Sequence, residues 1–174
     1  MDKELYDELL NILRILPSES PLLDYKEYLY DKKEYGELIK DICAFLNCTE
    51  GYGKNKFIIL GVVNRTKYRK GIIKGNMQDD NDFQALWENI YPRPHIETGE
   101  IDYEGITYGY IYISKDNTDR VYSIIKDYPN DIVTREEEQN KIKTKAYAST
   151  AFIRKGSVKY PLNEADRRKI YEHD

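Results

Sequence analysis

The feature that most limits the fold of this chain is an uninterrupted apolar run, Phe57-Ile-Ile-Leu-Gly-Val-Val63. A strand with one solvated face alternates apolar and polar residues, whereas a continuous apolar run is typical of a strand buried on both faces. The preceding residues 47–56 contain Gly51 and Gly53 and are expected to form a turn. The run therefore predicts a central strand in a sheet that other elements cover on both sides.

Two amphipathic helices are expected before this strand. The first spans 2–16 and ends at Pro17, and the second spans 33–47. Residues 22–28, which mix polar and apolar side chains, are expected to be extended between them. The apolar positions that define the two helix faces are Leu5, Leu9, Ile12, Leu13 and Leu16 in the first helix and Tyr35, Leu38, Ile42, Phe45 and Leu46 in the second.

The second half of the chain mixes short strands with helices. Acidic residues at 79–82 are expected to cap a helix over 82–90, whose Trp87 faces the core and which Pro92 and Pro94 end. The further expected elements are a short strand at Ile72–Ile73, a hairpin of 95–103 and 105–114 around Glu104-Gly105, a strand at 121–126, a helix or a mobile insertion at 134–145, a strand at 149–154, a turn at 155–157, and a helix from Asn163 whose Asn-Glu-Ala-Asp opening resembles a capping box.

These elements predict an α/β (α+β) fold, in which a mixed β-sheet is flanked by helices. The chain has 174 residues, 40% of them hydrophobic, which is enough to build one core. The sequence contains neither an internal repeat nor a convincing linker. We therefore expect a single domain over 1–174, which could be the N-terminal domain of a longer parent protein.

The charge balance and the cysteines narrow the functional classes. The formal net charge of −4 argues against indiscriminate coating of DNA, but it leaves room for a local basic groove or a carboxylate-lined metal site. Cys43 and Cys48 lie five residues apart without Cys/His metal spacing, so we expect a reduced cytoplasmic protein. The N-terminus lacks the pattern of a signal peptide, and no apolar stretch approaches the roughly 20 residues of a membrane span, so no membrane partner is expected.

Tyrosine is unusually frequent, with 17 residues against four Phe and one Trp. Two explanations stay open. The tyrosines could simply fill a core and surface encoded by an AT-rich genome, since Lys, Ile and Asn are also abundant. Alternatively, some of them could form a stacking surface for bases or for a partner, because tyrosine offers a flat ring with a polar tip.

The segment Glu19-Ser-Pro-Leu-Leu-Asp-Tyr-Lys26 carries the clearest chemical pattern. Glu19 and Asp24 are candidates to hold a divalent ion that activates water, and Lys26 is a candidate to stabilise charge on a phosphate. On an extended chain, Asp24 and Lys26 point to the same side, because side chains alternate with a period of two. This combination suits a metal-assisted phosphodiester cutter; the alternative is that all three are ordinary surface charges.

A second candidate surface is basic. The stretch 64–75 has five basic residues in twelve and lies where a ligand would approach the end of the buried strand. The residues expected to contact nucleic-acid phosphates are Arg65, Lys67, Arg69, Lys70, Arg154 and Lys155. The alternative is that they are solvated charges. No Gly-x-x-x-x-Gly-Lys-Ser/Thr loop occurs, so no nucleotide cofactor is expected.

The order of short motifs along the chain resembles the AlbA-type domain of the Schlafen family. That family shows Glu-Ser, Glu-Phe-Lys, Ala-Phe-Ala-Asn, Ile-Gly-Val-Asp-Asp and Tyr-Ile-Arg-x-Gly-Ser. The corresponding motifs here are Glu19-Ser20, Asp24-Tyr25-Lys26, Cys43-Ala-Phe-Leu-Asn47, Ile59-Leu-Gly-Val62 and Ala151-Phe-Ile-Arg-Lys-Gly-Ser157. The resemblance covers roughly residues 15–170, nearly the whole chain.

The resemblance implies a nucleic-acid-binding domain with RNA or DNA as its partner. Its finer implication is an endoribonuclease that uses Mg or Mn, in a bacterial or phage-defence setting. The first two acidic residues of the family site match Glu19 and Asp24, which would hold the metal beside Lys26, whereas the third is replaced at Val63-Asn64. The alternative is a non-catalytic DNA- or RNA-binding or assembly module of a larger protein. Because vertebrate members build their groove from two such domains, a homodimer is expected.

Overall fold

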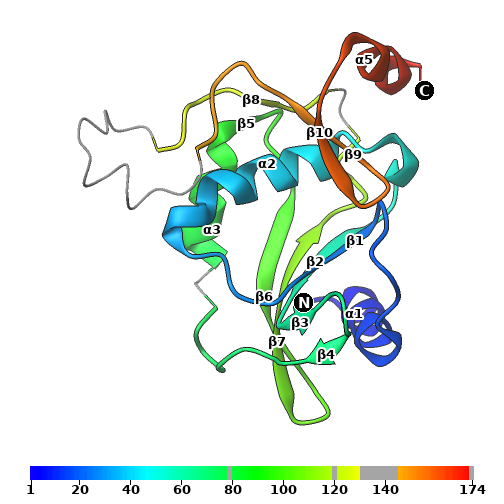
Figure 1. The fold of residues 1–174 in the computed structure, drawn as a ribbon, viewed down its shortest axis with the longest axis vertical. Coiled ribbons are helices and arrows are strands. Elements are labelled where there is room, and N and C mark those ends of the chain that lie inside the picture. The colour runs from blue at the N-terminus through cyan, green and yellow to red at the C-terminus, as the bar shows by residue number, and fades with distance from the viewer. Residues whose placement is uncertain (78–79, 119–120, 130–144, 173–174) are drawn as a thin grey trace.

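The computed structural model of the protein describes residues 1–77, 80–118, 121–129 and 145–172. Its centre is a four-stranded sheet in the order β1-β2-β7-β6 (Figure 1). β2 (Lys56–Leu60) runs parallel to β1 (Leu23–Lys26) and antiparallel to β7 (Ile106–Ile113), and β6 (Ile96–Tyr103) forms the other edge. The sheet is therefore mixed, and the predicted α+β class is confirmed.

Helices α1 (Lys3–Ile15) and α2 (Tyr35–Leu46) cover opposite faces of this sheet. The side chains of β2 alternate between the two covers. Phe57 and Ile59 pack with the apolar face of α1, whereas Ile58 and Leu60 pack with α2. This alternation explains why the sequence of β2 is apolar throughout.

The central strand is shorter than the apolar run. It breaks at Gly61, whose backbone has a φ of 104° and where a Cβ atom would lie 2.8 Å from the carbonyl carbon of Gly71. The chain then forms the small hairpin β3 (Val62–Val63) and β4 (Tyr68–Arg69). The strand expected at Ile72–Ile73 was wrong: the Gly71 N–H donates to the Gly61 carbonyl at 2.7 Å, which closes the hairpin before these residues.

The remaining elements are short. They are η1 (Lys32–Glu34), η2 (Thr49–Gly51), α3 (Asp80–Leu86), η3 (Trp87–Asn89), β5 (Ile90–Tyr91), β8 (Ser123–Ile124), β9 (Phe152–Lys155), β10 (Val158–Pro161) and α5 (Glu164–Tyr171). The helix expected over 82–90 becomes a 3-10 turn at Trp87, which is fully buried as predicted. The predicted capping box of α5 is confirmed. The expected helix or insertion at 134–145 falls, except for its last residue, outside the described part of the chain.

Asn47, which caps α2, fixes the C-terminal half of the chain over this helix. Its amide nitrogen donates to the carbonyls of Tyr122 and Phe152, and its amide oxygen accepts from the Tyr122 N–H, each at 2.8 Å. These bonds anchor the start of β9 on α2 and so bring the following residues to the edge of the sheet. The strand expected at 149–154 begins at Phe152 rather than at Ser149, whose φ of 63° is incompatible with a strand, and β10, which was not expected, follows it.

Cys43 and Cys48 are both free and buried. Within the described ranges, none of the helices is long and apolar enough to span a bilayer.

Candidate functional site

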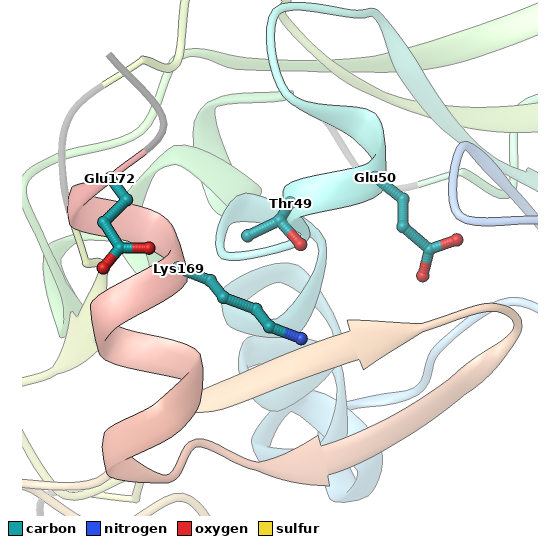
Figure 2. Close-up of a pocket in the computed structure, with 4 residues that line it drawn as sticks. All are labelled: Thr49, Glu50, Lys169 and Glu172. Atoms are coloured by element: carbon teal, nitrogen blue, oxygen red, sulfur yellow. The ribbon is translucent and has the colours of Figure 1, made fainter.

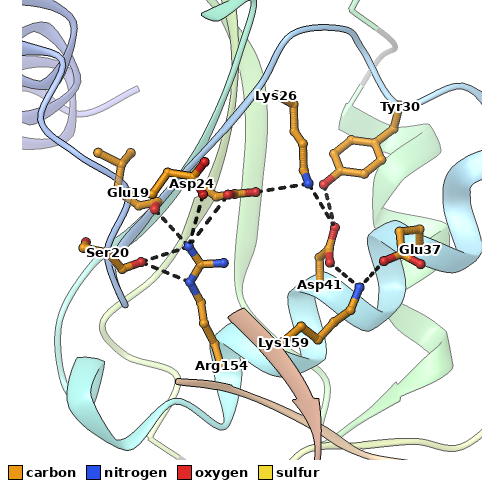
Figure 3. Close-up of polar contacts among 10 residues, drawn as sticks. Glu19, Ser20, Asp24, Lys26, Tyr30, Glu37, Asp41, Arg154 and Lys159 are labelled. Atoms are coloured by element: carbon orange, nitrogen blue, oxygen red, sulfur yellow. Dashed lines mark hydrogen bonds and ion pairs between the residues drawn. The ribbon is translucent and has the colours of Figure 1, made fainter. Parts of the chain in front are cut away.

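β1 is an edge strand, and its alternation divides the candidate residues between two faces. Leu23 and Tyr25 pack in the core with α1, whereas Asp24 and Lys26 point to the side of α2 (Figure 3). The Nζ atom of Lys26 lies 3.3 Å from Oδ2 of Asp24. The prediction that these two side chains share one side of an extended chain is therefore confirmed.

Glu19 reaches the same place through a tight turn. The backbone of Ser20 pairs with that of Leu23, with the Ser20 N–H donating to the Leu23 carbonyl at 3.0 Å. The Oγ atom of Ser20 also accepts from the Leu22 N–H at 3.1 Å. This turn folds the chain back so that the side chains of Glu19 and Asp24 both lie beside the guanidinium group of Arg154.

The carboxyl group of Glu19 has a pKa far above its ordinary value. Burial, followed by the hydrogen bond to Asp24 and the charge of that residue, raises the pKa of Glu19 to about 8. Arg154 and Lys26 oppose this rise without cancelling it. At pH 7 the site thus presents one protonated carboxyl group, that of Glu19, beside the side chain of Asp24.

Arg154 on β9 binds this pair from below in the view of Figure 3. Its Nε and Nη2 atoms donate to the Ser20 carbonyl at 3.0 and 2.9 Å, and Nη2 also donates to the Leu23 carbonyl at 3.0 Å. Nη2 lies 3.8 Å from Glu19 and 3.7 Å from Asp24. The guanidinium group also stacks 4.3 Å from the centre of the Phe45 ring. Arg154 therefore stabilises the turn that positions Glu19 and Asp24.

The structure corrects the expected role of Arg154. A direct phosphate contact was predicted, but the residue is only 6% exposed and its guanidinium group is engaged by two carbonyls and two carboxyl groups. Lys155, the next residue, leans toward α5 and forms an ion pair with Asp166 at 3.0 Å. Arg154 and Lys155, the two β9 residues predicted to contact phosphates, thus do not form one cluster with the basic residues of the hairpin.

A chain of alternating charges continues from Lys26 across α2. The Nζ atom of Lys26 lies 3.9 Å from Oδ2 of Asp41, which also accepts from the Tyr30 hydroxyl at 2.9 Å. Oδ1 of Asp41 accepts from Lys159 of β10 at 2.7 Å, and Lys159 also pairs with Glu37. Burial alone would lower the pKa of Lys26, but the facing Asp41, Asp24 and Glu19 raise it, so the amine stays charged.

In the part of the chain that the structure describes, the residues around Glu19 and Asp24 do not fit a resident Mg or Mn ion. Asn64, at the place of the third family acid, is exposed, and its Oδ1 atom accepts from Lys67 at 2.7 Å. Asp80 accepts from the backbone and side chain of Thr98 on β6, away from the site. Across the described ranges, no three His, Cys, Asp or Glu residues are grouped so that they could hold a metal. Hard cations require about six oxygen ligands, and here Arg154 and Lys26 already supply the positive charge.

The basic stretch lies beside Lys26 but is not uniform. The Gly61 N–H donates to the Lys26 carbonyl at 2.7 Å, which ties the β3–β4 hairpin to the end of β1. Lys67 lies 4.9 Å from the centre of the Tyr25 ring, and Arg69 lies 5.5 Å from that of Tyr103. Both side chains therefore fold back onto the protein.

Two other basic residues of this stretch are exposed. Lys70 pairs with Glu27 at 3.2 Å and lies 3.6 Å from the centre of the Tyr28 ring. Arg65 projects from the loop between the two hairpin strands. Of the four basic residues predicted in the hairpin region, Arg65 and Lys70 are thus the most available to a ligand.

A hollow of about 420 Å³ lies elsewhere, between η2 and α5 (Figure 2). Its lining includes side chains of both charges, namely Thr49, Glu50, Lys169 and Glu172. Oε1 of Glu50 accepts from the Gly156 N–H at 3.1 Å and so belongs to the packing of the β9–β10 turn. None of the residues singled out from the sequence lines this hollow.

Sequence reasoning missed Asp41, Glu37 and Lys159. A usable signal for the first two exists, because acidic residues at 37 and 41 lie four apart and therefore on one face of α2. Lys159 had no local signal, since its place beside α2 depends on the docking of the C-terminal hairpin.

Fold and site together define a class: an α+β domain whose edge strand carries a carboxyl pair held by an arginine from the C-terminal hairpin. The family model of the Schlafen AlbA_2 domain matches residues 19–163, from the first acid of the pair to the cap of α5. The chain therefore belongs to the Schlafen AlbA_2 family, as the motifs predicted. Membership in this family associates it with nucleic-acid-related function.

The fold is also similar to a solved structure, that of the DIP2311 protein from Corynebacterium diphtheriae. The TM-score is 0.58 at 12% sequence identity, and the match covers 98% of this chain. It covers 28% of the chain of that protein, so this chain spans less than a third of its length. At this identity the likeness shows the fold alone. No curated protein matches the sequence.

Proposed function

We propose that this chain binds RNA or DNA along a surface that runs from Lys26 onto the β3–β4 hairpin. The observation that carries the proposal is a local reversal of charge. Residues 64–77 contain five basic and no acidic residues in a chain with a net charge of −4. The hairpin hydrogen-bonds to the end of β1, so this positive segment adjoins the carboxyl pair and Lys26. Phosphate contacts by Lys and Arg are the main source of affinity in such surfaces.

The test is binding of fluorescently labelled nucleic acid measured over a range of salt concentrations. Affinity is expected to fall steeply with salt, and each lost phosphate contact should reduce the slope of log K against log salt by about 0.7–0.9. Arg65→Ala and Lys70→Ala should therefore both weaken binding and flatten this slope. Lys169→Ala, an exposed lysine of α5, serves as the control and should change neither. Salt-insensitive binding would refute the proposal.

A second candidate function is cleavage of RNA, favoured by the protonated Glu19 beside Asp24. In this reaction Asp24 takes the proton of a ribose 2′-hydroxyl, and the 2′-oxygen attacks the adjacent phosphorus. Glu19 gives its proton to the departing 5′-oxygen, and Lys26 stabilises the charge on the phosphate. The products are a 2′,3′-cyclic phosphate and a 5′-hydroxyl end, and no step passes through a metal.

Product analysis on a labelled transfer RNA tests this chemistry. Cleavage should leave cyclic phosphate ends, persist in EDTA, and be lost in both Asp24→Asn and Glu19→Gln. Cleavage that appears only with Mg or Mn would instead support the metal-dependent route expected from the family resemblance. Cleavage that is unchanged by Asp24→Asn would remove this residue from the reaction.

The alternative is a non-catalytic module that binds nucleic acid or assembles a larger protein, for example in a phage-defence setting. The missing acid at Asn64 favours it. Two copies would then form a dimer whose combined cleft holds the ligand. Light scattering with and without nucleic acid distinguishes a nucleic-acid-binding module from an assembly module. An assembly module should form a salt-insensitive dimer and no complex with nucleic acid, whereas a binding module should form such a complex.

A further inference from the structure

Three tyrosines stand out by their exposure. Many tyrosines are buried or half-buried, but Tyr28, Tyr68 and Tyr91 are each 65% exposed. A single exposed ring is ordinary on a protein surface, so the surroundings of each ring decide whether it can bind a ligand. Two of the three, Tyr28 and Tyr68, lie at the same edge of the molecule, one just after β1 and the other on β4.

Basic side chains lie beside both rings, and an acidic residue, Glu27, pairs with one of them, Lys70, at 3.2 Å. Tyr28 lies two residues beyond Lys26, and Lys70 places its Nζ atom 3.6 Å from the centre of the Tyr28 ring. Tyr68 stands within the basic stretch, with Arg65 before it and Lys70 after it. The contact with Lys70 restricts the Tyr28 ring, so the side chain of Tyr28 loses little further conformational freedom when a ligand stacks on it.

We propose that Tyr28 and Tyr68 form a stacking platform for the bases of an unpaired nucleic-acid strand, whose phosphates contact Arg65 and Lys70. The strand then leads toward Lys26 and the carboxyl pair. This inference rests on the proposed nucleic-acid binding and specifies its substrate class. Exposed aromatic rings beside lysine and arginine are how proteins bind single strands without sequence preference.

The platform favours an unpaired strand over a duplex for a physical reason. In a duplex the faces of the bases are stacked on one another and cannot reach a tyrosine ring, whereas the bases of a single strand can be splayed onto it. The adjoining β3–β4 hairpin has only two residues in each strand. It is therefore too short to fill the major groove of a duplex, which usually takes a helix or a long two-stranded ribbon.

The experiment compares a labelled oligouridylate of about 12 nucleotides, within the roughly 4–16 nucleotides that such surfaces cover, with a blunt duplex of equal length. The wild type should bind the single strand more tightly. Tyr68→Ala and Tyr28→Ala should each weaken that binding by about 5- to 150-fold, the equivalent of 1–3 kcal/mol per stacked base. Tyr68→Phe, which keeps the ring, should bind like the wild type.

Tyr91 provides a matched control. It has the same exposure but lies on β5, which pairs with β8 and not with the hairpin. Tyr91→Ala should leave the affinity unchanged. Thermal unfolding of all four variants checks that the fold is kept, as expected for side chains that are mostly in solvent.

The possible outcomes separate this inference from the proposal on which it rests. If the wild type binds but the tyrosine-to-alanine variants bind as well as it does, nucleic-acid binding stands and the platform is refuted. The platform is equally refuted if the duplex binds as tightly as the single strand. If neither probe binds the wild type, the proposed function itself fails, and the platform with it.

Discussion

Replacing Arg154 by Met tests whether this side chain holds the site together. The substitution keeps an unbranched chain of similar length but removes three hydrogen bonds to the Ser20 and Leu23 carbonyls. It also leaves Glu19 and Asp24, whose side chains are 15% and 9% exposed, without their arginine partner. Removing one member of a buried ion pair typically costs about 3–5 kcal/mol, a large part of the roughly 5–15 kcal/mol that stabilise a domain.

Thermal and urea unfolding measure this cost. For a domain of this size about 1 kcal/mol corresponds to roughly 2–4 °C, so Arg154→Met should lower Tm by about 6–20 °C. Arg93→Met is the control, because the side chain of Arg93 is 52% exposed and pairs with Glu88 at 3.9 Å; a loss below about 1 kcal/mol is expected. Adding Asp24→Asn to Arg154→Met should restore part of the stability, since one unpaired charge disappears. If Arg154→Met lowers the free energy of unfolding no more than Arg93→Met does, Arg154 does not stabilise this site.

Three further perturbations test other parts of the structure. The pKa of Glu19 is raised to about 8 from an ordinary value of 4.5, so its contribution to stability is full below pH 4.5 and is lost as pH rises through about 8. Urea unfolding across this range should show the free energy of unfolding decline, with a slope below the limit of about 1.4 kcal/mol per pH unit. Glu19→Gln should flatten this pH dependence. Asn47→Ala should cost about 3 kcal/mol in chemical unfolding, because it removes three hydrogen bonds, two of them buried and one part-buried, whereas Asn11→Ala on the exposed side of α1 should cost less than about 0.5 kcal/mol. Gly61→Ala should cost at least 1 kcal/mol more than Gly53→Ala, because both have a positive φ but only the Cβ atom added at Gly61 meets backbone; equal losses would contradict the close contact with Gly71.

Much of the fold could be predicted because it depends on local patterns. Helical spacing located α1 and α2, the continuous apolar run located β2, and the alternation around Glu104-Gly105 located the β6–β7 hairpin. The break after Leu60 could not be predicted. Gly61 lies inside an apolar run, and the reason it must be glycine is the close approach of Gly71, ten residues further on.

The candidate site was predictable only for the residues that neighbour one another in sequence. Glu19, Asp24 and Lys26 could be placed together because one turn and one strand carry them. The acidic face of α2 that carries Asp41 has a local signal, but its pairing with Lys26 and the role of Arg154 depend on how α2 and β9 pack against β1, which no local pattern encodes. From the sequence, Arg154 was expected to be either a solvated charge or a phosphate contact. The structure instead shows a buried guanidinium group that donates hydrogen bonds to the turn of the two acids.

The bond between Arg154 and Ser20 joins residues 134 positions apart, and this separation has a consequence for the newly made protein. During synthesis at roughly 5–20 residues per second, the two acids precede their arginine by about 7–27 s. A growing chain therefore carries Glu19 and Asp24 without the residue that orients them. The contacts between Arg154 and the turn of the two acids form only after β9 has been released and has docked on α2, so this arrangement is delayed until nearly the whole domain has been translated.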